Sequence, residues 1–204
     1  TGAKMISKKY RLNFLSSGLL YRYASYLILK YKPKDQINFL KKKFKKLNYK
    51  KLEKMDLQNP KISNHSSIIA KKNEIRNILK KFQKDFSKKY ANCCIEGRDI
   101  STKILPKSDL KFFFICNLQT AANRRYKELK KKYRKIKLKE VKKALRIRNI
   151  FDTKRKYSPL LKHRNSIVIN SSKLSKSMML TKMSFHVDRV LKKKYDSRTK
   201  PRKN

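Results

Sequence analysis

Glycine, proline, tryptophan and acidic residues are scarce in this sequence. Its 204 residues include three glycines, five prolines, no tryptophan, and 13 Asp or Glu against 59 Lys or Arg. No apolar run approaches the roughly 20 residues that cross a bilayer, so we expect no membrane span. The three cysteines are odd in number and lack metal-ligand spacing, which excludes a disulfide scaffold and predicts buried free thiols in a cytoplasmic protein.

The positive charge is the most unusual property that remains. The formal net charge is +46 at pH 7. Clustered cations neutralise phosphates, so one interpretation is a nucleic-acid-binding protein. The other is base composition, because Lys, Asn, Ile, Tyr and Phe are abundant and Lys greatly outnumbers Arg, the better bidentate phosphate ligand. We favour composition, and we still expect non-specific nucleic-acid binding at low salt.

Short β-prone runs alternate with stretches of helical periodicity. The runs that suit buried strands are 12–15, 92–95, 110–116 and 166–170. Apolar residues at helical spacing occupy 19–29, 34–46, 68–90, 120–132, 138–150 and 174–194. Residues 51–66 are polar, contain Pro60 and predict a loop. This alternation predicts an α/β fold with a parallel sheet flanked by helices, which binds ligands at the carboxyl ends of its strands.

Two glycines stand where such strands would end. Gly97 follows the second run and precedes Arg98 and Asp99, which places a guanidinium and a carboxylate at a strand end. Gly18 follows the first run and precedes a helix that carries Arg22; a helix N-terminus beside an arginine is an anion site. A structural ion pair and an ordinary capped helix are the competing interpretations.

A third group of charges lies at the end of the helical stretch 138–150 and just beyond it. Arg148, Asp152 and Arg155 are spaced by four and three residues, so they share one helical face. One carboxylate between two arginines would hold both in place, as a phosphate clamp requires. A solvated, salt-bridged face is the alternative.

Taken in order, four segments of the sequence resemble the cytidylate kinase family over nearly the whole chain. They are LSSGLLYRYAS at 15–25, IEGRDISTKILPKSDLKFFF at 95–114, NRRYKEL at 123–129 and RIRNIFDTKRKYSPL at 146–160. They are similar to the family's Asp-Thr/Ser-Gly-x-x-Tyr-Arg segment, its Gly-Arg-Asp strand end, its Arg-Arg helix and its Arg-Asp-x-x-Asp-x-x-Arg lid. Each motif is weak alone, and the shared order and spacing make the joint signal specific.

The resemblance implies a role for eleven residues. Those around CMP would be Ser17, Arg22, Ser67, Arg76, Arg98 and Asp99, with the arginines on its phosphate. The catalytic groups, which would reach in from the lid, would be Arg148, Asp152 and Arg155. Candidates to bind the sugar or base of CMP are Ser67, Asp99 and Asp152. Arg125 and Thr1 would face ATP, and the hydroxyl of Thr1 would contact Mg²⁺.

The implied fold is a P-loop NTPase-like parallel sheet with an acceptor-side segment and a lid. We expect one nucleoside monophosphate kinase domain over 1–194, with an acceptor-side insert at 31–66, a lid at 133–160 and a basic flexible tail at 195–204. By register Thr1 closes the family's glycine-rich phosphate loop, so we expect the rest of that loop and the first strand to lie outside this sequence. Without them the sequence as printed is expected to be inactive, and Ser16 in place of the family's Asp is a further departure.

The sequence thus predicts a monomeric cytoplasmic enzyme that transfers the terminal phosphoryl group of ATP to CMP or dCMP with Mg²⁺. Two alternatives stay open. One is a non-catalytic, basic nucleic-acid-binding protein built on the same fold. The other is a kinase of this fold that acts on another nucleoside monophosphate.

Overall fold

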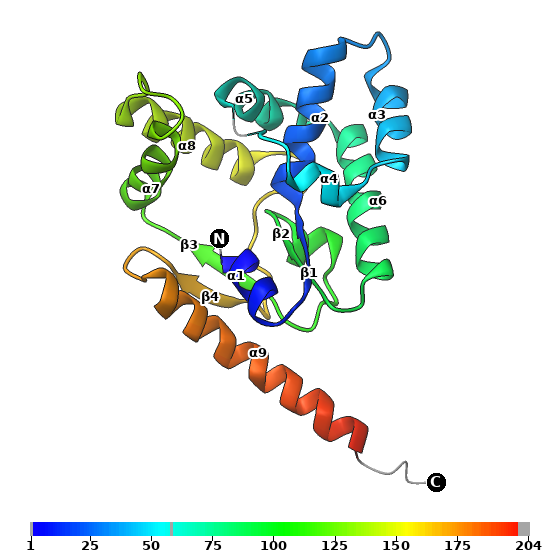
Figure 1. Cartoon of the computed structure of the whole chain (residues 1–204), viewed down its shortest axis with the longest axis vertical. Helices are drawn as coiled ribbons and strands as arrows, with labels where there is room; N and C mark the ends of the chain where they lie inside the picture. The colour runs from blue at the N-terminus through cyan, green and yellow to red at the C-terminus, as the bar shows by residue number, and fades with distance from the viewer. Residues whose placement is uncertain (1, 58, 200–204) are drawn as a thin grey trace.

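The chain forms an α/β structure in which helices surround two small parallel sheets (Figure 1). A computed structural model describes residues 2–57 and 59–199. The strands are β1 (Asn13–Ser16), β2 (Cys93–Glu96), β3 (Phe112–Ile115) and β4 (Ile167–Asn170). The helices are α1 (Gly2–Lys9), α2 (Ser17–Tyr31), α3 (Gln36–Lys45), α4 (Tyr49–Glu53), α5 (Pro60–Ile69), α6 (Asn73–Lys89), α7 (Leu118–Lys130), α8 (Leu138–Lys154) and α9 (Lys176–Thr199).

Each predicted strand exists within two residues of its expected position, and both strand pairs are parallel. In the first sheet Asn13 pairs with Cys93, and in the second Phe112 pairs with Ile167. The single continuous sheet that we expected is not found among the described residues. No described strand pairs with both β2 and β3, so the backbone hydrogen-bond ladder is interrupted between the two pairs.

The prediction of a loop over 51–66 was wrong. Helix α4 covers part of this segment, and its N-cap Asn48 accepts a hydrogen bond from the Lys51 amide. Helix α5 begins with Pro60 at its first turn, where a missing amide hydrogen costs nothing, after an N-cap at Asn59. Local side-chain caps thus produce helices in a polar stretch that lacks apolar periodicity.

Two other helix boundaries differ from the prediction. The expected helix over 68–90 is split at 70–72, so that its first residues belong to α5 and the rest form α6. Helix α9 runs to Thr199, well into the segment expected to be a tail, because neither Gly nor Pro interrupts the chain from 176 to 200. The remainder of that segment lies outside the described residues. Helix α1 was not predicted.

Apolar side chains gather in two clusters that hold these elements together. The larger joins β1, α2, α3, α5 and α6 through residues such as Leu20, Leu40 and Leu79, which are all 0% exposed. The smaller joins α1, β4 and α9 through Ile6, Ile169, Met179 and Met183. The prediction of buried cysteines was wrong, because Cys93 and Cys94 are only partly buried and Cys116 is exposed.

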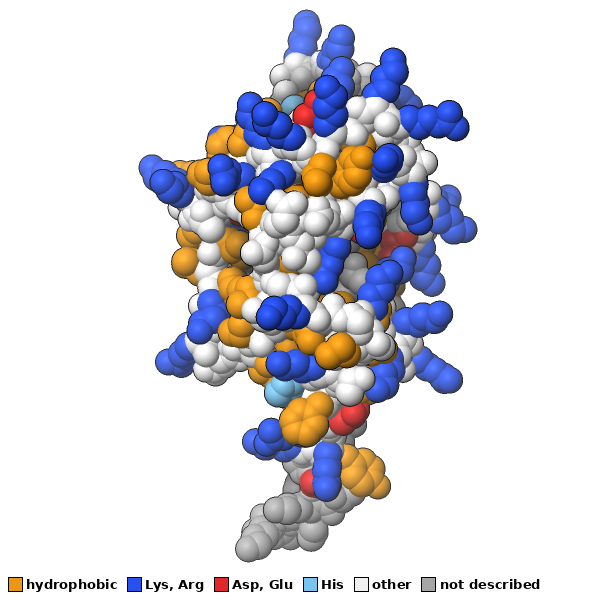
Figure 2. Space-filling view, turned by 90° about the vertical axis from the view of Figure 1, so that its left-hand side faces the viewer, with side chains coloured by type: hydrophobic (Ala, Val, Ile, Leu, Met, Phe, Trp, Pro, Cys, Tyr) orange, Lys and Arg blue, Asp and Glu red, His pale blue; other side chains and the backbone are white. Residues whose placement is uncertain are grey.

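The surface charge is broadly distributed. Figure 2 shows Lys and Arg side chains scattered over the face on the α7 and α8 side, with few acidic residues between them. No helix within residues 2–57 and 59–199 is long and apolar enough to cross a membrane.

Candidate active site

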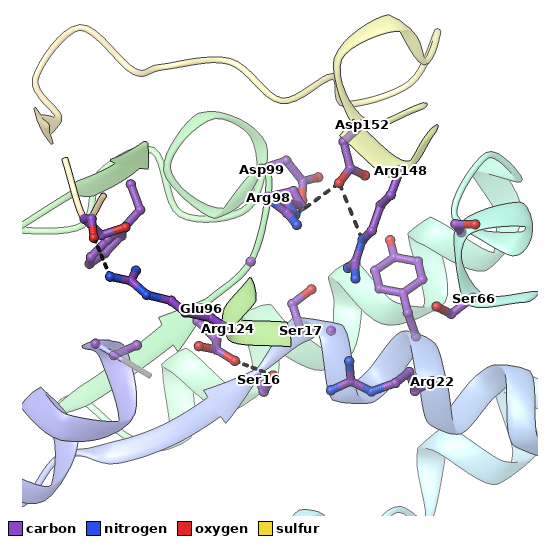
Figure 3. Close-up of a pocket in the computed structure, with 18 of the residues that line it drawn as sticks. Ser16, Ser17, Arg22, Ser66, Glu96, Arg98, Asp99, Arg124, Arg148 and Asp152 are labelled. Carbon is purple, nitrogen blue, oxygen red and sulfur yellow. Dashed lines mark hydrogen bonds and ion pairs between the residues drawn. The ribbon is translucent and has the colours of Figure 1, made fainter. Parts of the chain in front are cut away.

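A cavity of about 780 Å³ opens at the carboxyl ends of the strands (Figure 3). Residues just after β1, β2 and β4 line it, as Ser17, Gly97 and Ser171 illustrate. Parallel strands place their carboxyl ends, and the amide groups of the helices that follow, at the same edge of a sheet. The volume suits a nucleotide-sized ligand.

The structure brings nine of the eleven predicted site residues to this one cavity. Those that line it are Ser17, Arg22, Ser67, Arg76, Arg98, Asp99, Arg148, Asp152 and Arg155. They come from α2, α5, α6, the end of β2 and α8, so segments distant in the sequence converge. Thr1 lies outside the described residues.

Asp152 holds three arginines from two parts of the chain. Its carboxylate lies 3.1 Å from Nε of Arg98, 3.8 Å from Nε of Arg148 and 3.2 Å from a terminal nitrogen of Arg155. Arg98 follows β2, whereas the other three residues lie on α8 or just beyond it, so this cluster connects α8 to the strand end. Arg155 lies just beyond α8 and remains within reach of Asp152.

A second contact joins α8 to the turn between α5 and α6. The ammonium group of Lys71, between α5 and α6, lies 3.6 Å from the centre of the Phe151 ring on α8. Together with the Arg98–Asp152 pair, this cation–π contact holds α8 over the cavity.

Below this cluster, Arg76 and Asp99 form a buried ion pair. Their side chains are 6% and 5% exposed, and Arg76 also donates to the carbonyl of Ala70 at 3.1 Å. The ring of Tyr21 lies 5.7 Å from the Arg76 guanidinium, and burial raises the pKa of Tyr21 to about 12. Tyr21 is therefore neutral at physiological pH, and it lines the cavity as a flat, half-buried ring.

The cavity contains more positive charge than its carboxylates balance. Partial burial, with the nearby guanidinium of Arg98, lowers the pKa of Arg148 to about 10. Burial and the charge of Arg125 lower the pKa of Arg22, whose Nε is buried without a hydrogen-bond partner. Both stay protonated at pH 7. Such a cluster is arranged to receive an anion with several oxygens, for which phosphate is the usual biological ligand.

Comparison with known proteins identifies the family. A family model described as cytidylate kinase matches residues 1–189. This chain belongs to the cytidylate kinase family. Cytidylate kinases from Bartonella tribocorum and Clostridium tetani are 32% and 31% identical over 94% and 95% of the chain, covering 90% and 85% of the relatives. One from Rickettsia africae is 35% identical over 84% of the chain and 78% of the relative.

Ser16, the last residue of β1, lies beside a carboxylate from β2. The Ser16 hydroxyl donates to the Glu96 carboxylate at 2.7 Å, while its amide donates to the hydroxyl of Tyr49 at 2.6 Å. Burial raises the pKa of Tyr49, which keeps that hydroxyl protonated. The ends of β1 and β2 therefore carry a hydroxyl and a carboxylate side by side.

The arginine pair on α7, a family motif, contributes its other member to the cavity. Arg125, predicted to face ATP, pairs with Glu128 at 3.1 Å and does not line the cavity. Arg124 does line it, and donates to the carbonyls of Ser171 and Leu174 at 2.9 and 3.3 Å. The Arg-Arg motif predicted an arginine at the cavity, but only the orientation of α7 shows that this arginine is Arg124.

Gly97 makes close packing at the strand end possible. A Cβ atom built there would lie 2.8 Å from the side chain of Ile100 and 2.9 Å from Cβ of Ser17. We expect Gly97→Ala to lower the free energy of unfolding by about 1–3 kcal/mol, since the added methyl overpacks this junction. Urea unfolding measures the change.

Gly18→Ala is the matched control for that substitution. Its nearest contacts would be at 3.9 Å, and its φ is negative in a helix, so we expect no loss. Equal destabilisation by the two substitutions would contradict the packing argument.

Proposed function

We propose that this protein transfers the terminal phosphoryl group of ATP to CMP or dCMP. The observation that carries the proposal is the convergence of Arg22, Arg98 and Arg148 from three segments on one cavity, beneath a lid. Membership in a family whose relatives are named cytidylate kinases supports the reaction type. On this proposal residues 31–66 form the acceptor side and 133–160 the lid.

Phosphoryl transfer asks little covalent chemistry of the protein. It requires that two anionic substrates be aligned and that their charge be neutralised. In the proposed complex Arg22 and Arg98 bind the phosphate of CMP, and Arg148 and Arg155 neutralise charge on the transferring group. Because α8 covers the cavity, the lid also excludes water from the transfer.

The acceptor nucleoside would occupy the side of the cavity that contains Tyr21, Ser67 and the Arg76–Asp99 pair. These groups offer a flat ring, a hydroxyl and a fixed carboxylate, which suit a pyrimidine and its sugar. Ser67 donates to the carbonyl of Asn64 at 2.7 Å, so its oxygen remains available as an acceptor.

ATP would approach from the opposite side, near Arg124 and Glu96, with Mg²⁺ on its phosphates. The residues here fit the ion, because Ser16 and Glu96 supply hard oxygen atoms beside each other, and Mg²⁺ takes oxygen ligands and keeps several waters. When bound, Mg²⁺ neutralises phosphate charge. The described residues contain no group of three or more His, Cys, Asp or Glu that would form a metal site by themselves.

ADP release in a coupled assay with ATP, Mg²⁺ and CMP tests the proposal. The 204-residue chain is assayed beside a version with a family glycine-rich loop and its strand joined before Thr1, since the sequence has glycines only at 2, 18 and 97. We expect CMP-dependent turnover in at least the second form, and weaker turnover with UMP and AMP. No CMP-dependent turnover in either form contradicts the proposal, and faster turnover with UMP or AMP reassigns the acceptor.

Arg98→Ala is expected to weaken CMP binding. Loss of its charged hydrogen bonds, worth about 1.5–3 kcal/mol each, corresponds to roughly ten- to a hundredfold in Kd. Titration calorimetry measures the change. Arg189→Ala on α9, where the guanidinium only covers the ring of Phe185, is the matched control and should leave CMP affinity unchanged. An Arg98→Ala protein with the affinity of the control would rule out this phosphate contact.

A further inference from the structure

Aromatic rings alternate with lysines at the corner where α2 ends and α3 begins. Tyr23 and Tyr26 stack with centroids 6.4 Å apart, and Tyr31 lies 5.6 Å from Phe39 of α3. Tyr31 is 51% exposed, although large aromatic rings usually avoid that much water. We call Tyr23, Tyr26, Tyr31, Phe39, Lys30 and Lys43 the aromatic corner.

Two lysines of the aromatic corner are held against these rings. Lys30 Nζ lies 5.6 Å from the Tyr26 ring centre and 5.4 Å from that of Tyr31, and it donates to the Tyr26 hydroxyl at 3.1 Å. That hydrogen bond raises the pKa of Lys30, which is therefore fully charged. Lys43 Nζ lies 5.4 Å from Tyr31 and 5.5 Å from Phe39.

Further positive charge surrounds the corner, and the adjoining sequence contains a single acidic residue. The exposed lysines on α3 and its flanking turns are Lys32, Lys34, Lys41, Lys42, Lys45 and Lys46. Asp35 is the only acidic residue between 17 and 52. Its carboxylate caps α3 by accepting from the amides of Ile37 and Asn38, at 3.0 Å each, so it is occupied within the fold.

We propose that the aromatic corner binds single-stranded nucleic acid, with an unpaired base stacked on Tyr31 and backbone phosphates on Lys30 and Lys43. Partly exposed aromatic rings bordered by cations are the surface that single strands prefer, because every base has a flat face and every linkage a charge. Lys and Arg side chains also cover the face on the α7 and α8 side (Figure 2), so charge alone does not mark an interface. This corner differs in that Lys30 and Lys43 each lie over two aromatic rings.

This surface is separate from the cavity. Ser17 and Tyr31 are the two ends of α2, whose 15 residues are about 21 Å long from first to last residue at 1.5 Å per residue. Figure 1 shows the α2–α3 turn at the end of the molecule opposite α9. Binding at the corner and binding of CMP should therefore be independent.

Fluorescence anisotropy of a labelled oligouridylate and a labelled oligothymidylate tests the proposal, each titrated over a range of salt concentrations. We expect Tyr31→Leu to weaken binding of both about tenfold, through lost stacking. Lys30→Ser with Lys43→Ser should weaken both and reduce the salt slope by about 1.4, since each single-strand phosphate contact contributes about 0.7.

The matched controls lie on α9, at the far end of the molecule. They are Tyr195→Leu, whose side chain is 70% exposed, and Lys192→Ser with Lys193→Ser, both exposed. Equal losses from corner and control variants would mean that binding follows total charge, and would overturn the proposal. Urea unfolding of each variant verifies folding independently of oligonucleotide binding.

Three competitors define the ligand. An abasic oligomer should bind weakly and be insensitive to Tyr31→Leu, and a duplex should compete poorly, because its bases are not available for stacking. Anionic phosphatidylserine vesicles should also compete poorly. The assignment would be overturned if duplex, abasic oligomer or vesicles competed effectively, or if CMP displaced the oligonucleotide. A preference for the ribose or the deoxyribose strand would show whether the ligand is RNA or DNA.

Discussion

Asp99→Ala is expected to lower the free energy of unfolding by about 3–5 kcal/mol, the largest effect of any single substitution in the cavity. The side chains of Arg76 and Asp99 are 6% and 5% exposed, so the substitution leaves a guanidinium buried with only the carbonyl of Ala70 as a partner. A buried, unpaired charge costs far more than the ion pair itself contributes. Urea unfolding measures the loss.

A double substitution separates the buried charge from the loss of packing. Arg76→Met with Asp99→Leu removes both charges and keeps apolar volume, so we expect most of the stability to return. The double variant should nevertheless bind CMP poorly, because both residues line the cavity. A loss below about 1 kcal/mol in Asp99→Ala would mean that water reaches Arg76, contrary to the burial described above.

Asp152→Asn should lower kcat/KM for CMP by roughly a hundredfold. The substitution is made in the form of the protein that shows CMP-dependent turnover, with or without the added glycine-rich loop. The substitution preserves size and removes the charge that holds Arg98, Arg148 and Arg155 together. Repulsion then separates Arg148 and Arg155 from Arg98, and a displacement of about 1 Å at a reacting centre costs on the order of a hundredfold. Steady-state kinetics with varied CMP measure the change.

Asp109→Asn is the matched control for Asp152→Asn. Asp109 also pairs with a cation, Lys194 at 2.8 Å, but its side chain is 62% exposed and outside the cavity. We expect turnover equal to that of the unsubstituted protein. If the Asp152→Asn variant kept more than a third of the kcat/KM of the unsubstituted protein, the positions of the arginines would not depend on this carboxylate.

Local sequence patterns predicted the strands well. The run at 92–95 became β2 (Cys93–Glu96), because short β-branched and apolar runs have few ways to be buried other than in a sheet. Gly97, which follows β2, lies where the side chains of Ile100 and Ser17 come close to the backbone. The family motifs then indicated which polar residues would converge, which composition and periodicity alone could not do.

Other features depended on interactions that a local pattern does not contain. Helix α5 forms in a polar segment because Asn59 caps it and Pro60 begins its first turn. Each of these signals is a single residue, so an analysis of apolar periodicity does not detect it. Whether Arg124 or Arg125 faces the cavity is decided by the carbonyls of Ser171 and Leu174, far along the chain. The interruption between β2 and β3 likewise depends on which strands lie side by side in space.

Titration calorimetry of CMP against cytidine tests the central claim most directly, that arginines from separate segments bind one phosphate. The phosphate is the only difference between these ligands. We predict that CMP binds at least about a hundredfold more tightly than cytidine, since two charged hydrogen bonds contribute about 3 kcal/mol or more. Equal affinities would show that Arg22 and Arg98 do not act on the phosphate of CMP.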